Sequence, residues 1–144
     1  MKKTIQAKTI EDKDVIIAFD VSGSKTNIDN IKSMLSIFAN IVRDYNYKGH
    51  ILLCDEKIVF DFNIDEIEAL DNYVLSINSN TCDYRSVFEY AKQKVENDNC
   101  DIFKIYFITD GFGIFPRESE FDTIWVTGKD IGIFPFGEVF EIKV

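Results

Sequence analysis

Apolar residues in this chain gather in short runs that have the length of β-strands. Residues 15–19 form an uninterrupted run (VIIAF), and residues 101–108 and 123–127 form two more that are largely apolar, the last around the only tryptophan. A strand that is apolar at successive positions, rather than at alternate ones, is typical of a sheet buried on both faces. We therefore expect the first two runs to be adjacent interior strands of one sheet.

Two other segments have the three-to-four-residue spacing of amphipathic helices. One covers about residues 28–44, and the other follows residue 83. Their apolar positions are Ile28, Ile31, Leu35, Phe38 and Val42 in the first segment, and Val87, Phe88, Ala91 and Val95 in the second. Residues 64–76 carry a weaker pattern, which is helical at the start and extended at the end.

A short turn at Asp55-Glu56 separates the apolar residues 51–54 from a further run at 57–62. So short a connection joins antiparallel strands only. A last edge strand is predicted at 139–142.

Strands that alternate with helices predict an α/β fold. We expect a three-layer arrangement, with a mainly parallel central sheet, helices on both faces and one antiparallel edge hairpin strand. The pattern predicts a single domain over residues 14–144, preceded by a polar segment at 1–13. In such sheets, ligands bind outside the carboxyl ends of the strands.

The sharpest polar motif lies directly after the first predicted strand, where Asp20, Ser22 and Ser24 alternate around Gly23. Carboxylate and hydroxyl oxygens are hard ligands that suit Mg²⁺, Mn²⁺ or Ca²⁺. Asp110 follows the strand at 101–108 in the same way. If the two strands are neighbours, both carboxylates face one crevice. The alternatives are a loop at 20–24 that only caps the next helix and a simple Asp-Gly turn at Asp110.

The formal net charge of −9 argues against nucleic acid or an anionic membrane as the main partner, since both favour basic surfaces. The charge also has a simpler interpretation, which is solubility. Three cysteines without a CxxC pair fit reduced thiols, and no signal peptide or membrane-length apolar run is present, so we expect a cytoplasmic protein. The single histidine excludes a histidine-rich metal site and disfavours a Ser-His-Asp triad.

Four motifs that occur in order along residues 14–144 resemble those of a known domain family. They are 19–24 (FDVSGS), 82–90 (CDYRSVFEY), 106–116 (YFITDGFGIFP) and 135–137 (PFG), with Trp125 between the last two. This pattern resembles von Willebrand factor A-type (VWA-like) domains. It is most similar to the bacterial subgroup usually found C-terminal to a predicted metallopeptidase-like region.

The resemblance implies a metal-ion-dependent adhesion site (MIDAS). Ser22 and Ser24 would bind a divalent cation through their hydroxyls, and Asp20 and Asp110 would act directly or through water. A partner protein would complete the coordination with its own acidic residue. The resemblance also implies a non-catalytic adaptor, which in related systems works with a MoxR-type AAA+ ATPase.

The chain departs from the family pattern at the metal-loop threonine, whose position is taken by Cys82. A thiol is a poor ligand for Mg²⁺, and the adjacent Thr81 is the alternative ligand. Ser79 and Asn80 also stand where glycines are usual. The cation is therefore expected to bind weakly or not at all, and the second interpretation is a degenerate VWA scaffold that binds protein without metal.

A less favoured interpretation is a two-metal nuclease built on Asp20, Asp83 and Asp110. We expect Asp83 instead to cap the following helix near the backbone of Ser86. Phe112, Phe115 and Pro116 are predicted to form a protein-binding rim beside Asp110, and Phe134 and Phe136 to belong to the core.

Overall fold

The computed structural model describes residues 14–22, 25–72, 81–98, 101–128 and 132–142. Within these described residues, six strands, two α-helices and a 3₁₀-helix follow one another. They are β1 (Asp14–Asp20), α1 (Lys25–Tyr45), β2 (Lys48–Cys54), β3 (Ile58–Asn63), η2 (Ile64–Asn72), α2 (Arg85–Asn97), β4 (Ile102–Ile108), β5 (Thr123–Thr127) and β6 (Glu138–Glu141). The weak helical pattern at 64–76 corresponds to η2, and its expected extended end at 73–76 lies outside the described residues.

The six strands form one sheet in the order β3-β2-β1-β4-β5-β6. Every neighbouring pair is parallel except β2 and β3, which are antiparallel. The predictions of an α/β fold, of a mainly parallel sheet and of an antiparallel edge strand are therefore confirmed. The predicted neighbours β1 and β4 do lie side by side in the interior.

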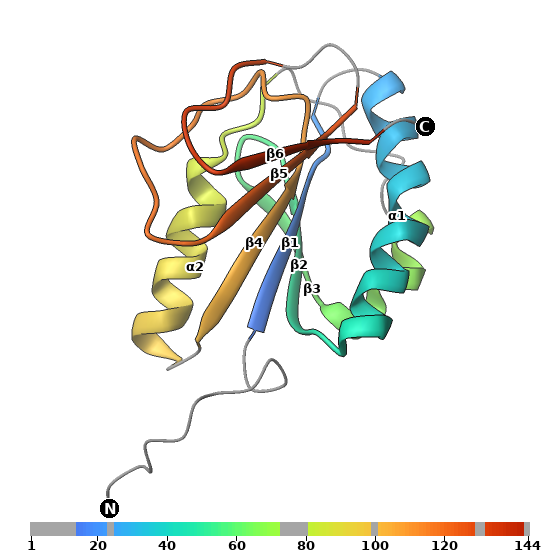
Figure 1. Cartoon of the computed structure of the whole chain (residues 1–144), viewed down its shortest axis with the longest axis horizontal. Coiled ribbons are helices and arrows are strands. Elements are labelled where there is room, and N and C mark those ends of the chain that lie inside the picture. The colour runs from blue at the N-terminus through green and yellow to red at the C-terminus, as the bar shows by residue number, and fades with distance from the viewer. Residues whose placement is uncertain (1–13, 23–24, 73–80, 99–100, 129–131, 143–144) are drawn as a thin grey trace, which may run out of the picture.

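The two faces of the sheet are covered by different helices, with α1 on one face and α2 on the other (Figure 1). Along β1, Val15, Ile17 and Phe19 face the cluster that includes α1 and η2. Ile16 and Ala18 face the cluster that includes α2. This alternation follows from the two-residue period of a strand, and burial on both faces explains why β1 is apolar throughout.

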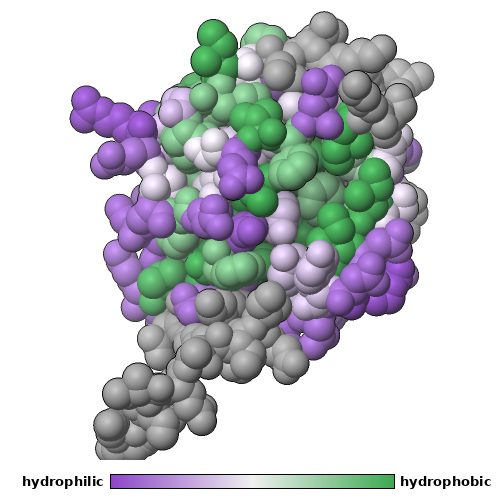
Figure 2. All heavy atoms as spheres, in the orientation of Figure 1, coloured by the Kyte–Doolittle hydropathy of each residue, from purple (hydrophilic) through white to green (hydrophobic). Residues whose placement is uncertain are grey.

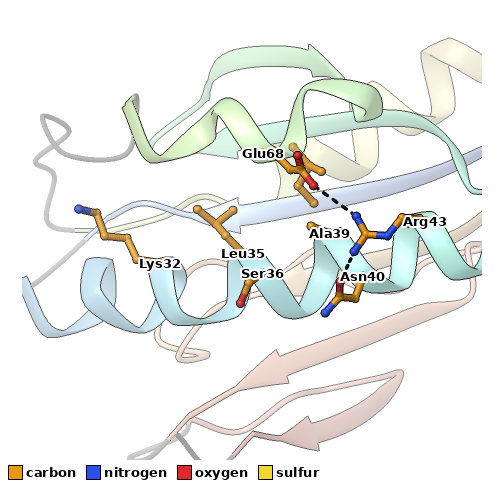
Figure 3. Close-up of a pocket in the computed structure, with 8 residues that line it drawn as sticks. Lys32, Leu35, Ser36, Ala39, Asn40, Arg43 and Glu68 are labelled. Atoms are coloured by element: carbon orange, nitrogen blue, oxygen red, sulfur yellow. Dashed lines mark hydrogen bonds and ion pairs between the residues drawn. The ribbon is translucent and has the colours of Figure 1, made fainter.

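A shallow groove of about 290 Å³ lies where η2 packs beside α1 (Figure 3). Arg43 of α1 bridges the two helices there, since its guanidinium lies 3.3 Å from Glu68 of η2 and also contacts Asn40. Both members of the ion pair are exposed, so the bridge adds little to stability. None of the candidate site residues lines this groove.

A larger, mainly apolar groove of about 520 Å³ lies between α1 and the strands β4, β5 and β6. Figure 2 shows hydrophobic residues gathered in this region between β6 and α1. Phe140 of β6 is 57% exposed at its edge. Among the described residues, no helix is long and apolar enough to cross a membrane.

The parallel arrangement brings the carboxyl ends of three interior strands together. Asp20 at the end of β1 pairs with Cys54 at the end of β2, and Phe19 pairs with Ile108 of β4. Thr109, the next residue of that chain segment, therefore lies beside Asp20. Asp20, Ser22 and Asp110, three of the polar residues that the sequence analysis selected, lie at this carboxyl edge.

Candidate metal centre

Asp20 is a buried carboxylate at the last position of β1, with 1% of its surface exposed. Its Oδ1 accepts a hydrogen bond from the backbone N–H of Ser22 at 2.9 Å and another from the Ser22 hydroxyl. Asp20 thus fixes the start of the loop after β1, because its side chain binds the backbone two residues ahead.

The second oxygen of Asp20, Oδ2, accepts a hydrogen bond from the hydroxyl of Thr109. The Thr109 oxygen in turn accepts the Gly111 N–H at 3.2 Å and lies 2.7 Å from the hydroxyl of Tyr84. Because the Thr109 hydrogen points to the carboxylate, Tyr84 is the donor in that contact. Tyr84 also accepts the Gly113 N–H at 2.8 Å, so a directed hydrogen-bond chain runs from Gly113 to Asp20.

Burial raises the pKa of Asp20 from its ordinary 3.8 to about 6. The hydrogen bonds from Ser22 and Thr109 act in the opposite direction, and the negative charge of Asp110 raises the pKa further. Most Asp20 side chains are ionised at neutral pH, at a cost in free energy that a bound cation would offset.

Asp110 lies at the same edge, half-buried, directly after Thr109. Its Oδ1 accepts the N–H of Phe112 at 3.0 Å. This hydrogen bond forms the Asp-Gly turn that the sequence analysis named as the alternative to a metal-binding role. Gly111 within this turn has a φ of 88°, and a Cβ there would lie 2.6 Å from the Phe134 ring. The turn holds Asp110 close enough to Asp20 for its charge to affect that pKa.

Thr81 and Cys82 are the two candidates for the place of the metal-loop threonine of the VWA-like pattern, and they differ in burial. Thr81 is exposed, whereas Cys82 is 1% exposed. The Cys82 Sγ lies 3.3 Å from the Sγ of Cys54. This contact raises the pKa of Cys82 strongly, with burial and the nearby charge of Asp20 acting in the same direction. The Cys82 side chain is therefore a protonated thiol, which is a weak ligand for a hard cation.

Asp83 binds Arg85 rather than the backbone of Ser86. Its Oδ1 accepts the N–H of Arg85 at 3.1 Å, and its two oxygens accept the guanidinium at 2.9 and 2.8 Å. Arg85 holds the pKa of Asp83 below its usual value. The expected capping role is met at Arg85, the residue before Ser86, while the Ser86 N–H itself donates to the backbone oxygen of Asp83. The carboxylate still satisfies one free N–H at the start of α2.

No group of three or more His, Cys, Asp or Glu side chains in the described parts of the chain is placed to hold a metal. A cation at this edge would consequently need hydroxyl or water oxygens as well as carboxylates. The hydroxyls of Ser22 and Thr109 both contact Asp20, and Ser24 lies outside the described residues.

Four residues at this edge were not identified from the sequence. Thr109 donates to Asp20, Tyr84 contacts Thr109, and Cys54 contacts Cys82. Asp55 follows β2 and is 8% exposed, and its Oδ1 is buried with no hydrogen-bond partner among the described residues. Thr109 could have been found, because the predicted pairing of β1 with β4 places it beside Asp20. The others depend on loop geometry.

The aromatic residues divide between core and surface. Phe134 and Phe136 pack against Trp125 with ring centroids 5.3 and 5.7 Å away, so their predicted core role is confirmed. Phe115 was expected in the rim, but its ring packs against that of Tyr84, with the two ring centroids 4.8 Å apart. Phe112 is exposed beside Asp110 as expected (65%), and Ile114 (44%) and Ile133 (90%) are exposed there as well.

No protein-family model matches the chain, and no curated protein matches it.

Proposed function

We propose that this domain is a non-catalytic adaptor that binds a divalent cation at the carboxyl edge and uses it to capture an acidic residue of a partner protein. The observation that carries the proposal is Asp20, a buried carboxylate held by the hydroxyls of Ser22 and Thr109 beside the second carboxylate of Asp110. The fold class and the DxSGS motif agree with the VWA-like arrangement that the sequence resembles.

The donor set suits a hard cation such as Mg²⁺, Mn²⁺ or Ca²⁺. Asp20 and Ser22 would hold the ion, with Ser24 and Asp110 acting directly or through water. Thr109 has a positioning role, because its oxygen already accepts two hydrogen bonds and donates one to Asp20. The bound cation would supply a positive charge that attracts the partner's carboxylate.

Exposed apolar side chains support a protein partner. Phe112 and Ile114 lie two and four positions after Asp110, and the N–H of Gly132, next to Ile133, donates to the Asp110 backbone oxygen at 2.8 Å. An apolar rim around a polar centre is the arrangement expected of a protein-binding hot spot. A MoxR-type AAA+ ATPase is the partner class that the resemblance favours.

Calorimetry with Mn²⁺ and the full chain at neutral pH tests the metal site. We expect weak, saturable binding that Asp20→Ala abolishes and that Ser22→Ala weakens at least tenfold. The matched control is Asp83→Asn, which changes an acidic residue of the same edge that binds Arg85 and should leave the affinity unchanged. Binding that survives Asp20→Ala would contradict the proposal.

A metal-free scaffold is the second candidate, and the buried Cys82 thiol is the observation that favours it. In that case, Mn²⁺ shows no saturable binding to the wild-type chain or to Cys82→Thr. The nuclease alternative needs Asp83 to converge with Asp20 and Asp110, whereas its carboxylate is bound by Arg85. Cleavage of DNA or RNA by the purified chain that Asp83→Asn removes would favour the nuclease.

A further inference from the structure

Two thiols that lie far apart in the sequence meet behind the carboxyl edge of the sheet. Cys54 ends β2 and Cys82 precedes α2, 28 positions later, and their sulfur atoms are 3.3 Å apart. Both side chains are fully or almost fully buried, at 0% and 1% exposure. A disulfide bond is about 2.0 Å long, so the sulfurs must approach by a little over 1 Å.

The backbone next to each cysteine is already held in place. The N–H of Asp83 donates to the backbone oxygen of Asp55 at 2.9 Å, so the residues that follow the two cysteines are hydrogen-bonded to each other. The Cys82 thiol also lies 3.6 Å from the backbone oxygen of Cys54. The two segments that carry the cysteines are therefore already adjacent, as a disulfide requires.

We propose that Cys54 and Cys82 are a disulfide-forming pair, oxidised by a peroxide and restored by a dithiol. One thiol loses its proton and attacks a peroxide oxygen, which breaks the O–O bond, releases water and leaves a sulfenic acid. The second sulfur then attacks the first, forming the S–S bond, breaking the S–O bond and releasing a second water. Two thiols and one hydrogen peroxide thus give one disulfide and two waters.

Burial sets the rate of this modification. Peroxide reaches the sulfurs when the segment at 81–84 opens locally, so the first step is slow compared with that of an exposed thiol. The second step is fast, because the partner sulfur is already in contact. The bond closes a loop that contains β3 and η2, and it therefore restricts the unfolded chain and stabilises the fold. This inference does not depend on the proposed metal site.

Peptide mapping after treatment of the full-length, reduced chain with hydrogen peroxide tests the pair. We expect the intact mass to fall by two hydrogen atoms, one linked peptide pair to contain Cys54 and Cys82, and dithiothreitol to reverse both changes. The melting temperature of the oxidised chain should rise by several degrees. Cys100→Ser is the matched control and should give the same product.

Cys54→Ser and Cys82→Ser should each abolish the linked peptides, and circular dichroism will show whether each variant is folded. The Cys100→Ser chain keeps the test valid if either variant fails to fold, because it retains both members of the pair. Two results would overturn the proposal. One is Cys54 and Cys82 remaining reduced while Cys100 is oxidised, and the other is conversion of either residue to a sulfinic acid without a disulfide.

Discussion

At the scale of the residue, Asp20 links protonation to metal binding. Its carboxylate is buried and its pKa is raised to about 6, while the hydroxyls of Ser22 and Thr109 offset part of the cost of ionisation. A proton and a cation would compete for the same oxygens. The effect of pH is therefore predicted separately for the metal-free and the metal-bound protein.

Without metal, Asp20 should destabilise the fold as the pH rises. The folded-state pKa of about 6 lies above the ordinary 3.8, so the contribution to stability is fully present below pH 3.8 and is lost as the pH rises through 6. Relative to Asp20→Asn, the wild-type free energy of unfolding should fall by up to about 3 kcal/mol across this window. Urea denaturation of both proteins in a chelator measures it, and a difference that does not change with pH would contradict the assignment.

Replacing Cys82 by threonine should strengthen Mn²⁺ binding, because a hydroxyl oxygen is a harder ligand than a thiol. The same change removes the contact with the Cys54 sulfur and should lower stability by about 1 kcal/mol. Calorimetry and urea denaturation measure the two effects. Cys82→Ala is the control, since it removes the thiol without adding an oxygen and should leave the affinity unchanged. If Thr81→Ala weakens binding and Cys82→Thr does not strengthen it, Thr81 is the ligand.

At the scale of the element, the sequence predicted the strands better than the loops. The continuous apolar run of β1 and the run of β4 predicted two neighbouring buried strands, and their ends placed Asp20 and Asp110 at one edge. The loops were harder, because a loop side chain takes its direction from contacts distant in the sequence. Asp83 turns to Arg85, and Cys82 turns to Cys54, and neither contact has a periodic signal.

The Tyr84 hydroxyl adds to two backbone hydrogen bonds that join the start of α2 to Ile114 in the loop after β4. Tyr84 accepts the Gly113 N–H and donates to Thr109. Tyr84→Phe should therefore lower stability by about 1–3 kcal/mol, since it leaves the Gly113 N–H without its acceptor. It should also weaken Mn²⁺ binding, because Thr109 then holds Asp20 less firmly. Phe88→Leu, a change in the same core without a hydroxyl, should lower stability without changing metal affinity.

At the scale of the whole molecule, the candidate site exists only in the folded chain. Asp20, Cys82 and Thr109 come from three separate segments that the strand order brings together. A ligand that binds here binds the folded state alone, so it stabilises that state by mass action. The net charge of −9 further favours cations around the domain.

The melting temperature should consequently rise with Mg²⁺ concentration at pH 7.5. At ten times the dissociation constant, the gain is about 1.4 kcal/mol for a single site. At pH 5 the gain should shrink, because Asp20 is then mostly protonated. Asp20→Asn should show only the small rise that non-specific binding to an acidic protein gives. A rise of equal size in the wild type and in Asp20→Asn would assign the effect to the surface charge.

Anomalous diffraction from crystals grown with Mn²⁺ tests the central claim most directly, because it locates the ion. The account predicts one strong peak at the carboxyl edge, bounded by the Asp20 carboxylate and the Ser22 hydroxyl, with Asp110 on its far side or one water away. The peak should be absent from crystals of Asp20→Asn grown in the same way. An ordered Asp20 and Ser22 with no peak between them, or a peak that persists in Asp20→Asn, would contradict the account.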